Sequence, residues 1–248
     1  MKYFWKQYED LPDGLGYGRF STEHILTLIA AAAVIVLLVY WFSKSTDKGR
    51  KRFLTVIPLL MVVMECFKDS FLAVSGHFGV GYLPLHLCSL GVFIFLLYLA
   101  SKTDKWKSVF SEIALTLILP GSIAALLFPD WAHLYPVFNF MNLYGYAWHT
   151  LLVVYPLLMM KNGDSDLSIR HFHYDCLFLL VVVPPVYLFD KRFDCNYMFV
   201  NRPPKGTPLE LVYNITGDTW YLLGYVVFAV LVILVIYTVI SIFKKGKG

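Results

Sequence analysis

The chain has 248 residues, of which 58% are hydrophobic and only 15% are charged, and its formal net charge is +4. Soluble domains carry about a quarter charged residues, whereas here the apolar residues fall in long uninterrupted runs. This composition excludes a soluble globular protein and favours a polytopic membrane protein. The basic residues are spread over short loops instead of one face, which excludes a nucleic-acid-binding surface.

Seven apolar segments are long enough to cross a bilayer, for which about 20 residues are needed. We therefore expect an all-α, polytopic membrane helix bundle of about seven transmembrane helices, with residues 1–248 forming a single transmembrane domain. The seven segments are 23–43, 53–75, 83–100, 108–128, 137–160, 172–189 and 220–243.

Basic residues alternate between the loops that join these segments. Loops 44–52, 101–107 and 161–171, together with the C-terminal tail, hold thirteen Lys and Arg residues, against seven on the other side. The short loops 76–82 and 129–136 hold none. An excess of Lys and Arg marks the cytoplasmic side. We therefore expect the N-terminus outside, the C-terminus in the cytoplasm, and a multi-pass protein of the plasma membrane.

Two stretches outside the apolar segments are distinctive. Residues 1–22 mix polar and aromatic side chains and do not resemble a cleavable signal peptide, so we expect them at the membrane surface. Segment 190–219 is a long outer loop that includes Tyr197-Met198-Phe199-Val200. Loops of this length are usually functional or disordered, and the aromatic content argues against disorder. Segment 190–219 is therefore a candidate lid over the outer end of the bundle.

The motif Leu83-Pro84-Leu85-His86-Leu87-Cys88-Ser89-Leu90 opens an apolar segment with an imidazole, a thiol and a hydroxyl. Polar groups at membrane depth are costly and usually functional. A thiol paired with an imidazole becomes a strong nucleophile toward esters. On an α-helix His86 and Cys88 point about 200° apart, so a nucleophilic Cys88 needs its base from another helix. The alternative is that Cys88 is a small buried hydrophobic residue.

His149 is the first candidate for that base, because it lies in the middle of the fifth apolar segment. Asn142, seven residues earlier, falls on nearly the same helix face. Counted from the outer loops, Cys88 and His149 differ in depth by roughly 10 Å, and His133 in the outer loop is a shallower candidate. A lone buried histidine is more often a packing residue than a catalyst, so both interpretations of His149 stay open.

The second apolar segment carries Glu65, Lys68 and Asp69 on one helix face. One interpretation is a self-neutralising structural cluster that holds this helix inside the bundle. The other is a set of groups that orient the active-site histidine.

Metal and cofactor sites are not predicted. The four cysteines show no CxxC spacing, the histidines show no HExxH motif, and His171-Phe172-His173 lies near the cytoplasmic end. These are the spacings by which zinc sites are recognised in sequences.

Several motifs together resemble a known family. The motif Leu83–Leu90, Phe128-Pro129-Asp130, His149, and Asn196-Tyr197-Met198-Phe199 with Arg202-Pro203-Pro204 downstream are similar to the bacterial YwaF-type integral membrane proteins and their eukaryotic relatives, the transmembrane protein 164 group.

The resemblance implies a membrane acyltransferase that moves a fatty acyl chain from a phospholipid to a lysophospholipid without coenzyme A. It also implies that Cys88 is the nucleophile and His149 the base. A more remote similarity to the androgen-inducible lipid hydrolases, with a threonine nucleophile and a histidine, keeps plain hydrolysis open.

Our hypothesis from the sequence is therefore a Cys–His acyltransferase that acts on phospholipid and lysophospholipid, binds no cofactor and contacts no nucleic acid. Asn142 is a candidate to orient His149, and Asn196 is a candidate to stabilise the oxyanion. The supporting residues of this hypothesis are His86, Asn142, Asn196, His133, Glu65 and Asp69.

Two alternatives remain. The same site could end its reaction at water, as a phospholipase or fatty-ester hydrolase. A non-enzymatic transporter or receptor is the second alternative. In that case Glu65 and Asp69 should matter and Cys88 should be dispensable.

Overall fold

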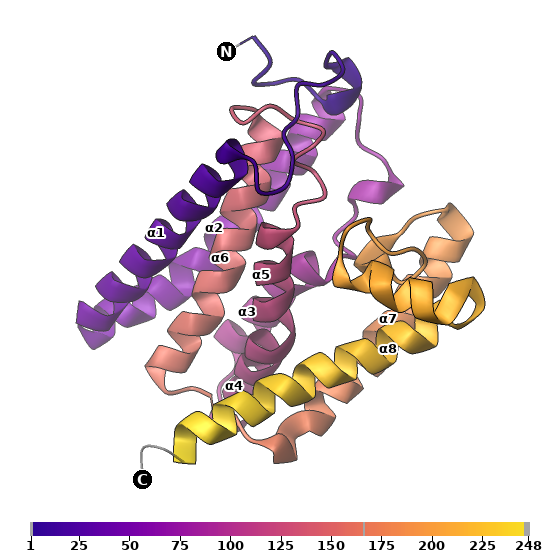
Figure 1. Ribbon diagram of the computed structural model, residues 1–248. Helices are drawn as coiled ribbons and strands as arrows, with labels where there is room; N and C mark the ends of the chain where they lie inside the picture. The colour runs from indigo at the N-terminus through magenta and orange to yellow at the C-terminus, as the bar shows by residue number, and fades with distance from the viewer. Residues whose placement is uncertain (1, 166, 246–248) are drawn as a thin grey trace. The chain divides into compact units, whose positions relative to one another are not determined.

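The computed structural model describes residues 2–165 and 167–245 and the side chains through residue 239. Within these residues all regular secondary structure is helical, which confirms the predicted all-α fold (Figure 1). Lys247, one of the basic residues counted in the C-terminal tail, lies outside the described residues.

Each predicted apolar segment coincides with helical structure. The helices are α1 (Thr22–Lys44), α2 (Asp47–Val74), α3 (Leu87–Ala100), α4 (Asp104–Ile113), α5 (Leu119–Leu127), α6 (Phe140–Asn162), α7 (Phe172–Phe193) and α8 (Pro208–Lys245). A π-helical turn, η3 (Ala114–Ile118), joins α4 to α5, and the 3-10 turns are η1 (Tyr8–Asp10), η2 (Val80–Tyr82), η4 (Ile169–His171) and η5 (Tyr197–Phe199).

Among the described residues, five helical segments are long and apolar enough to cross a membrane: Thr22–Lys44, Asp104–Leu127, Phe140–Asn162, Ile169–Phe193 and Pro208–Val239. The chain is therefore a polytopic helical protein. Helix α3 is shorter, at 14 residues, and α2 carries several charges. A count of seven crossings and the orientation of the termini stay predictions.

Local sequence explains where the long helices begin. Ser21, Thr46 and Thr103 are the N-caps of α1, α2 and α4, and each side-chain oxygen accepts the backbone N–H three residues later. Each cap is followed by an acidic residue in the first turn. The cap satisfies one unpaired donor, and the acid complements the positive end of the helix dipole.

The segment between α7 and α8 is shorter than the predicted loop 190–219. Helix α7 continues to Phe193, and a new helix begins at Pro208, which suits a first helical position because its missing N–H would have no partner there. Gly217, with φ 69°, interrupts α8 before the long apolar part begins. Of the predicted loop 190–219, only residues 194–207 lie outside these two helices.

The chain divides into two compact units. Unit 1 comprises Met1–Tyr82 and Leu119–Asn162, and unit 2 comprises Leu83–Ile118 and Gly163–Gly248. The boundary within the Asp104–Leu127 helix follows η3 directly. Pro120, two residues later, lacks the N–H that would donate to the Thr116 carbonyl. A single transmembrane domain over 1–248 stays a prediction.

In unit 1, α6 packs against α1, α2 and α5 (Figure 1). The N-terminal segment, predicted only as a surface stretch, is tied to this unit. Phe140 donates its N–H to the Phe4 carbonyl at 2.8 Å. The buried Asn139 side chain donates to the Tyr3 and Lys6 carbonyls. Residues that precede the first long helix thus fix the start of α6.

In unit 2, α7 and the η5 turn bury a core beneath the cysteine motif. Tyr197, Met198 and Val200 pack with Val183 and Val186 of α7, and leucines of the Leu83–Leu90 motif lie against this cluster. The Tyr-Met-Phe-Val sequence of the predicted outer loop therefore packs against leucines of the motif within the same unit, and its role as a lid stays a prediction.

The N-terminal segment offers a test of its packing. A Cβ built on Gly16 would overlap the backbone carbonyl group of His133, whereas one on Gly18 meets nothing within 4 Å. Because a backbone cannot yield as a side chain can, Gly16→Ala should lower the free energy of unfolding by about 1–3 kcal/mol. Thermal unfolding in detergent measures this, with Gly18→Ala as the matched control. Equal stability of the two variants would contradict the packing.

Candidate functional site

Cys88 lies in the first turn of α3 and is half-buried. His86 is the N-cap of this helix, with extended backbone angles φ −67° and ψ 149°, so it is not part of the helix. The 200° separation expected for two helical residues therefore does not apply to His86 and Cys88. The His86 side chain does not cap α3. Its Nδ1 accepts the backbone N–H of Met198 at 3.3 Å.

The turn that supplies this N–H has an unusual backbone. Met198 and Phe199 adopt φ values of 53° and 59°, in the left-handed region that favours glycine. Each such residue costs of order 1–3 kcal/mol and persists only where its surroundings impose it. The His86 ring packs against Tyr197 and Phe199, with ring centroids 4.8 Å and 5.7 Å apart. The η5 turn and His86 thus stabilise each other through a hydrogen bond and ring packing.

Asn196, a candidate to stabilise the oxyanion, closes this turn. Its side-chain N–H donates to the Arg202 carbonyl at 2.9 Å, and its side-chain oxygen accepts the Arg202 N–H at 3.0 Å. Tyr221 supports the turn by donating its hydroxyl to the Phe199 carbonyl at 2.7 Å. Both the oxygen and the nitrogen of the Asn196 carboxamide are therefore hydrogen-bonded to the Arg202 main chain. Its role at an oxyanion stays a prediction.

Tyr197 anchors the same turn beneath the motif. Burial raises the pKa of Tyr197 to about 12, while a hydrogen bond from the Leu83 backbone acts in the opposite direction. The phenol is therefore a neutral group at physiological pH. Its contact with Leu83 joins the turn to the first residue of the motif.

His149, the candidate base, is buried in α6 of unit 1. Its Nδ1 lies 2.7 Å from the carbonyl oxygen of Gly145, one helical turn earlier. A carbonyl can only accept, so Nδ1 carries the proton and the neutral ring keeps its lone pair on Nε2. The Trp131 indole stacks on this ring at 5.0 Å and 11°. His149 is thus held in the tautomer that a base requires.

Gly145 makes that stack possible. A Cβ at this position would lie 2.7 Å from Cε2 and 2.8 Å from Nε1 of Trp131. Sequence reasoning missed both residues, although Trp131 directly follows the Phe128-Pro129-Asp130 motif.

His24 shows what a purely structural histidine looks like in the same unit. Its Nδ1 accepts the Phe20 N–H at 2.8 Å, and its Nε2 lies 2.9 Å from the Leu126 carbonyl. Both ring nitrogens are therefore bound to main chain. Among the described residues, only Gly145 hydrogen-bonds to the His149 ring, which leaves Nε2 of His149 available for chemistry.

Asn142 shares the His149 helix but has other partners. Its Oδ1 accepts the Tyr17 hydroxyl at 3.0 Å, and its Nδ2 donates to the Val137 carbonyl at 2.9 Å. His133 is exposed in the loop before α6. Asn142 therefore ties the N-terminal segment to α6, and the orienting role predicted for it stays a prediction.

The charged cluster on α2 forms as its spacing predicted. The Lys68 ammonium lies 2.9 Å from Glu65 Oε1 and 3.0 Å from Asp69 Oδ1. The Tyr144 hydroxyl of α6 donates to the other oxygen of Glu65. The Tyr144 ring in turn stacks on Trp148 at 5.5 Å. These contacts link α2 to α6 and support the structural interpretation of the cluster.

The predicted residues are thus divided between the units. Cys88, His86 and Asn196 lie in unit 2, and His149, Asn142, His133, Glu65 and Asp69 lie in unit 1. Among the described residues, no three of His, Cys, Asp and Glu gather in a way that could hold a metal ion.

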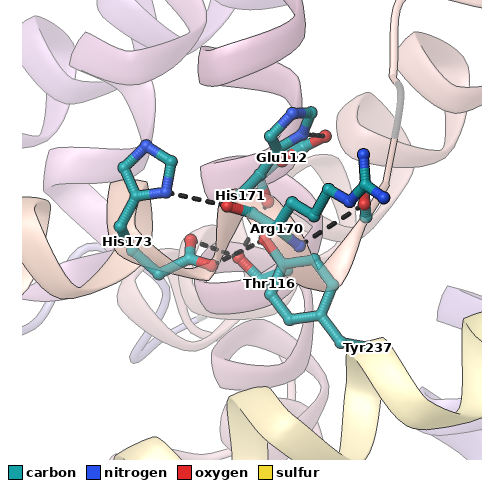
Figure 2. A network of polar contacts seen from close by, with 8 residues as sticks. Glu112, Thr116, Arg170, His171, His173 and Tyr237 are labelled. Carbon is teal, nitrogen blue, oxygen red and sulfur yellow. Dashed lines mark hydrogen bonds and ion pairs between the residues drawn. The ribbon is translucent and has the colours of Figure 1, made fainter.

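A polar network that sequence reasoning missed lies in unit 2 (Figure 2). His171 Nδ1 is 2.7 Å from Glu112 Oε1. The Asp175 carboxylate accepts the Thr116 hydroxyl at 2.6 Å and the Tyr237 hydroxyl at 2.9 Å. Glu112, Thr116 and Asp175 are fully buried. The network joins the π-helical turn to α7 and α8, and no local sequence motif signals it.

Comparison with known proteins finds a match to a protein family. The model of the TMEM164 family matches residues 19–237, a range that contains Cys88, His149 and the η5 turn. No curated protein and no solved structure matches the chain.

Removal of one hydroxyl should weaken the buried network. Tyr237→Phe leaves one oxygen of the Asp175 carboxylate without its donor and should lower the free energy of unfolding by about 1–3 kcal/mol. Chemical unfolding in detergent measures the loss. Tyr40→Phe removes a hydroxyl from an exposed ring and serves as the control. A Tyr237→Phe protein as stable as that control would show that the network contributes nothing.

Cys195, beside the η5 turn, should react slowly with alkylating agents. Burial raises the pKa of its thiol, and the negative charges of Asp190 and Asp194 raise it further. Because the thiolate is the reactive form, modification by iodoacetamide should begin at higher pH than for an unperturbed thiol. Asp194→Asn should move this profile to lower pH, and Asp13→Asn in unit 1 should not. Peptide mass spectrometry across neutral to alkaline pH reads the profile, and an unchanged profile in Asp194→Asn would contradict the assignment.

Proposed function

The chain belongs to the TMEM164 family, and from this membership we propose that it is a lipid acyltransferase embedded in the membrane. The family and the five apolar helices identify an integral membrane protein. In the proposed reaction a phospholipid donates an acyl chain and a lysophospholipid accepts it, without coenzyme A. We place the reaction at the plasma membrane. The family resemblance, the position of Cys88 at a helix start and the tautomer of His149 support this proposal.

Cys88 is the proposed nucleophile. It lies in the first turn of α3, where the helix dipole favours negative charge. In other proteins, cysteines at helix N-termini are often reactive because the thiolate is stabilised there. A thiol in the middle of an apolar helix lacks this support. The position of Cys88 at a helix start, two residues after the His86 that contacts the strained η5 turn, therefore fits a reactive cysteine better than a packing residue.

His149 is the proposed base, and its tautomer carries most weight in the proposal. With Nδ1 bound to the Gly145 carbonyl, the lone pair on Nε2 can take a proton. The face of an indole attracts cations, so the stacked Trp131 ring stabilises the imidazolium that forms. The role of base is assigned to His149 from its own chemistry and from the family resemblance.

The reaction then has two balanced halves. The thiol proton of Cys88 passes to Nε2 of His149, and Sγ attacks the ester carbonyl carbon of the phospholipid. The bond from that carbon to the glycerol oxygen breaks, and the proton passes from His149 to the departing oxygen. In the second half a lysophospholipid hydroxyl gives its proton to His149 and attacks the thioester. Cys88 leaves as a thiolate and recovers the proton.

An acyl adduct on Cys88 is the expected observation. Purified protein incubated with a phosphatidylcholine of defined acyl chains should gain the mass of one acyl group, mapped to Cys88 by peptide mass spectrometry. Cys88→Ala should abolish the adduct, because the nucleophile is gone. Cys176→Ala, which removes a half-buried thiol from α7, should retain it.

Other outcomes separate the alternatives. Release of free fatty acid with no re-acylated lipid would indicate a hydrolase. Absence of any adduct on the wild-type protein, incubated without a lysophospholipid acceptor, would contradict the proposal, and Glu65→Gln and Asp69→Asn would then test a transporter or receptor function.

A further inference from the structure

Helix α8 consists of two helical parts that meet at Gly217. The first part, residues 208–216, ends where Gly217 adopts a left-handed φ of 69°. A Cβ built on Gly224 would lie 2.8 Å from Cγ1 of Val212 and 2.6 Å from Cγ2 of Thr216. In one straight helix Val212 and Gly224 would be about 18 Å apart along the axis. The chain therefore folds back at Gly217, and the first part of α8 packs against the second.

Tyr213 extends this contact toward the η5 turn. Its ring lies 5.5 Å from the ring of Tyr221, in an edge-on arrangement. Tyr221 in turn donates its hydroxyl to the Phe199 carbonyl at 2.7 Å. The first part of α8 is therefore connected to the strained turn through a single tyrosine of the second part.

Another face of the first part is apolar and exposed. Leu211 and Ile215 are 65% and 85% exposed, and they share one side of the helix because they are four residues apart. Pro208, one turn earlier, is exposed as well. Glu210 and Asn214 share a different side, about 100° away around the axis. Residues 208–216 thus form an amphipathic helix whose outer apolar face needs an apolar environment.

The second part of α8 shows which environment that is. It belongs to Pro208–Val239, a segment long and apolar enough to cross a membrane. Residues at every fourth position along it are more than half exposed: Leu223, Val227, Leu231 and Val235. Such a stripe on a membrane-spanning helix faces lipid. Gly224 and Leu231 are seven residues apart, which returns to nearly the same face. The first part therefore packs on a side of α8 that faces lipid further along the helix.

The residues after the bend are those of a membrane–water boundary. Trp220 is 64% exposed, and the polar Asp218 and Thr219 before it are exposed too. Tryptophan is enriched at this boundary because its ring is apolar and its N–H is polar. The bend at Gly217 therefore marks the level at which α8 leaves the hydrocarbon.

We propose that residues 208–216 form an interfacial helix whose partner is the phospholipid bilayer. Leu211 and Ile215 lie among the upper parts of the acyl chains, and Glu210 and Asn214 face water. Amphipathic helices of this kind lie in the membrane plane, with the apolar face about 5–10 Å into the boundary between headgroups and acyl chains. This inference needs an integral membrane protein but no acyl transfer, so it is independent of the proposed reaction.

The lipid contact also stabilises the η5 turn. With the first part of α8 held at the bilayer, Tyr213 stays against Tyr221, and the Tyr221 hydroxyl stays on the Phe199 carbonyl. The bilayer thereby supports a backbone conformation that is costly by itself. Release of the interfacial helix from the lipid should therefore loosen the turn.

Photo-crosslinking in phosphatidylcholine nanodiscs tests the lipid contact. Full-length protein with p-benzoylphenylalanine in place of Ile215 should form a phospholipid adduct on irradiation, measured by intact-protein mass spectrometry. The same replacement at Asn214 is the matched control and should give several-fold less adduct, because its side faces water. Equal yields at the two positions would overturn the inference. A covalent dimer at position 215 without a lipid adduct would overturn it too, since a second copy of the chain would then cover this face.

Hydrogen exchange supplies a second readout. Ile215→Asp places a charge among acyl chains, where it is costly, and should speed amide exchange of residues 197–199 and 208–216 several-fold in the same nanodiscs. Asn214→Asp adds the same charge on the polar side and should leave exchange unchanged. Because Ile215 is exposed on the protein, its substitution removes little internal packing. Exchange in Ile215→Asp equal to that in Asn214→Asp would overturn the inference. A missing acyl adduct on Cys88 would overturn only the proposed function.

Discussion

A polar side chain placed among apolar helices must find its hydrogen-bond partner within the protein, because lipid offers none. In this chain the main chain supplies many of those partners. The carbonyl oxygen of Gly145 hydrogen-bonds to His149 and that of Leu126 to His24. The Leu54 carbonyl accepts the hydroxyl of Tyr155. Main-chain groups are fixed by the fold, whereas side chains can rotate. A side chain bound to main chain therefore has an orientation, and for histidine a tautomer, that the backbone determines.

Hydrophobic runs were sufficient to predict the helices. Every predicted apolar segment coincides with helical structure, because a long run of apolar residues satisfies its own backbone only as a helix. The ends of the helices were predicted less accurately where a proline or glycine starts or interrupts a helix. The loop predicted over 190–219 is shortened by helical turns that begin at Pro208, and Gly217 separates these turns from the long helix. These turns are too short, and too often interrupted by polar residues, to stand out as a membrane-spanning run.

The candidate site was predicted only in part, since helical geometry was assumed for its motif. His86 is an N-cap with extended backbone, so helical spacing could not describe its relation to Cys88. The left-handed angles at Met198 and Phe199 have no signal in the sequence, because glycine would be the expected residue there. Partnerships such as Thr116 with Asp175 join residues far apart in the chain, and only packing brings them together.

The retention of non-glycine residues in that turn is itself informative. Glycine at Phe199 would adopt the left-handed backbone without strain, but it would remove a ring that packs on His86. Glycine at Met198 would remove a buried side chain from the core beneath the motif. The contacts therefore compensate for the backbone strain and at the same time fix the imidazole. A turn built from glycine would be easier to form and freer to move, and it would hold the His86 ring less firmly.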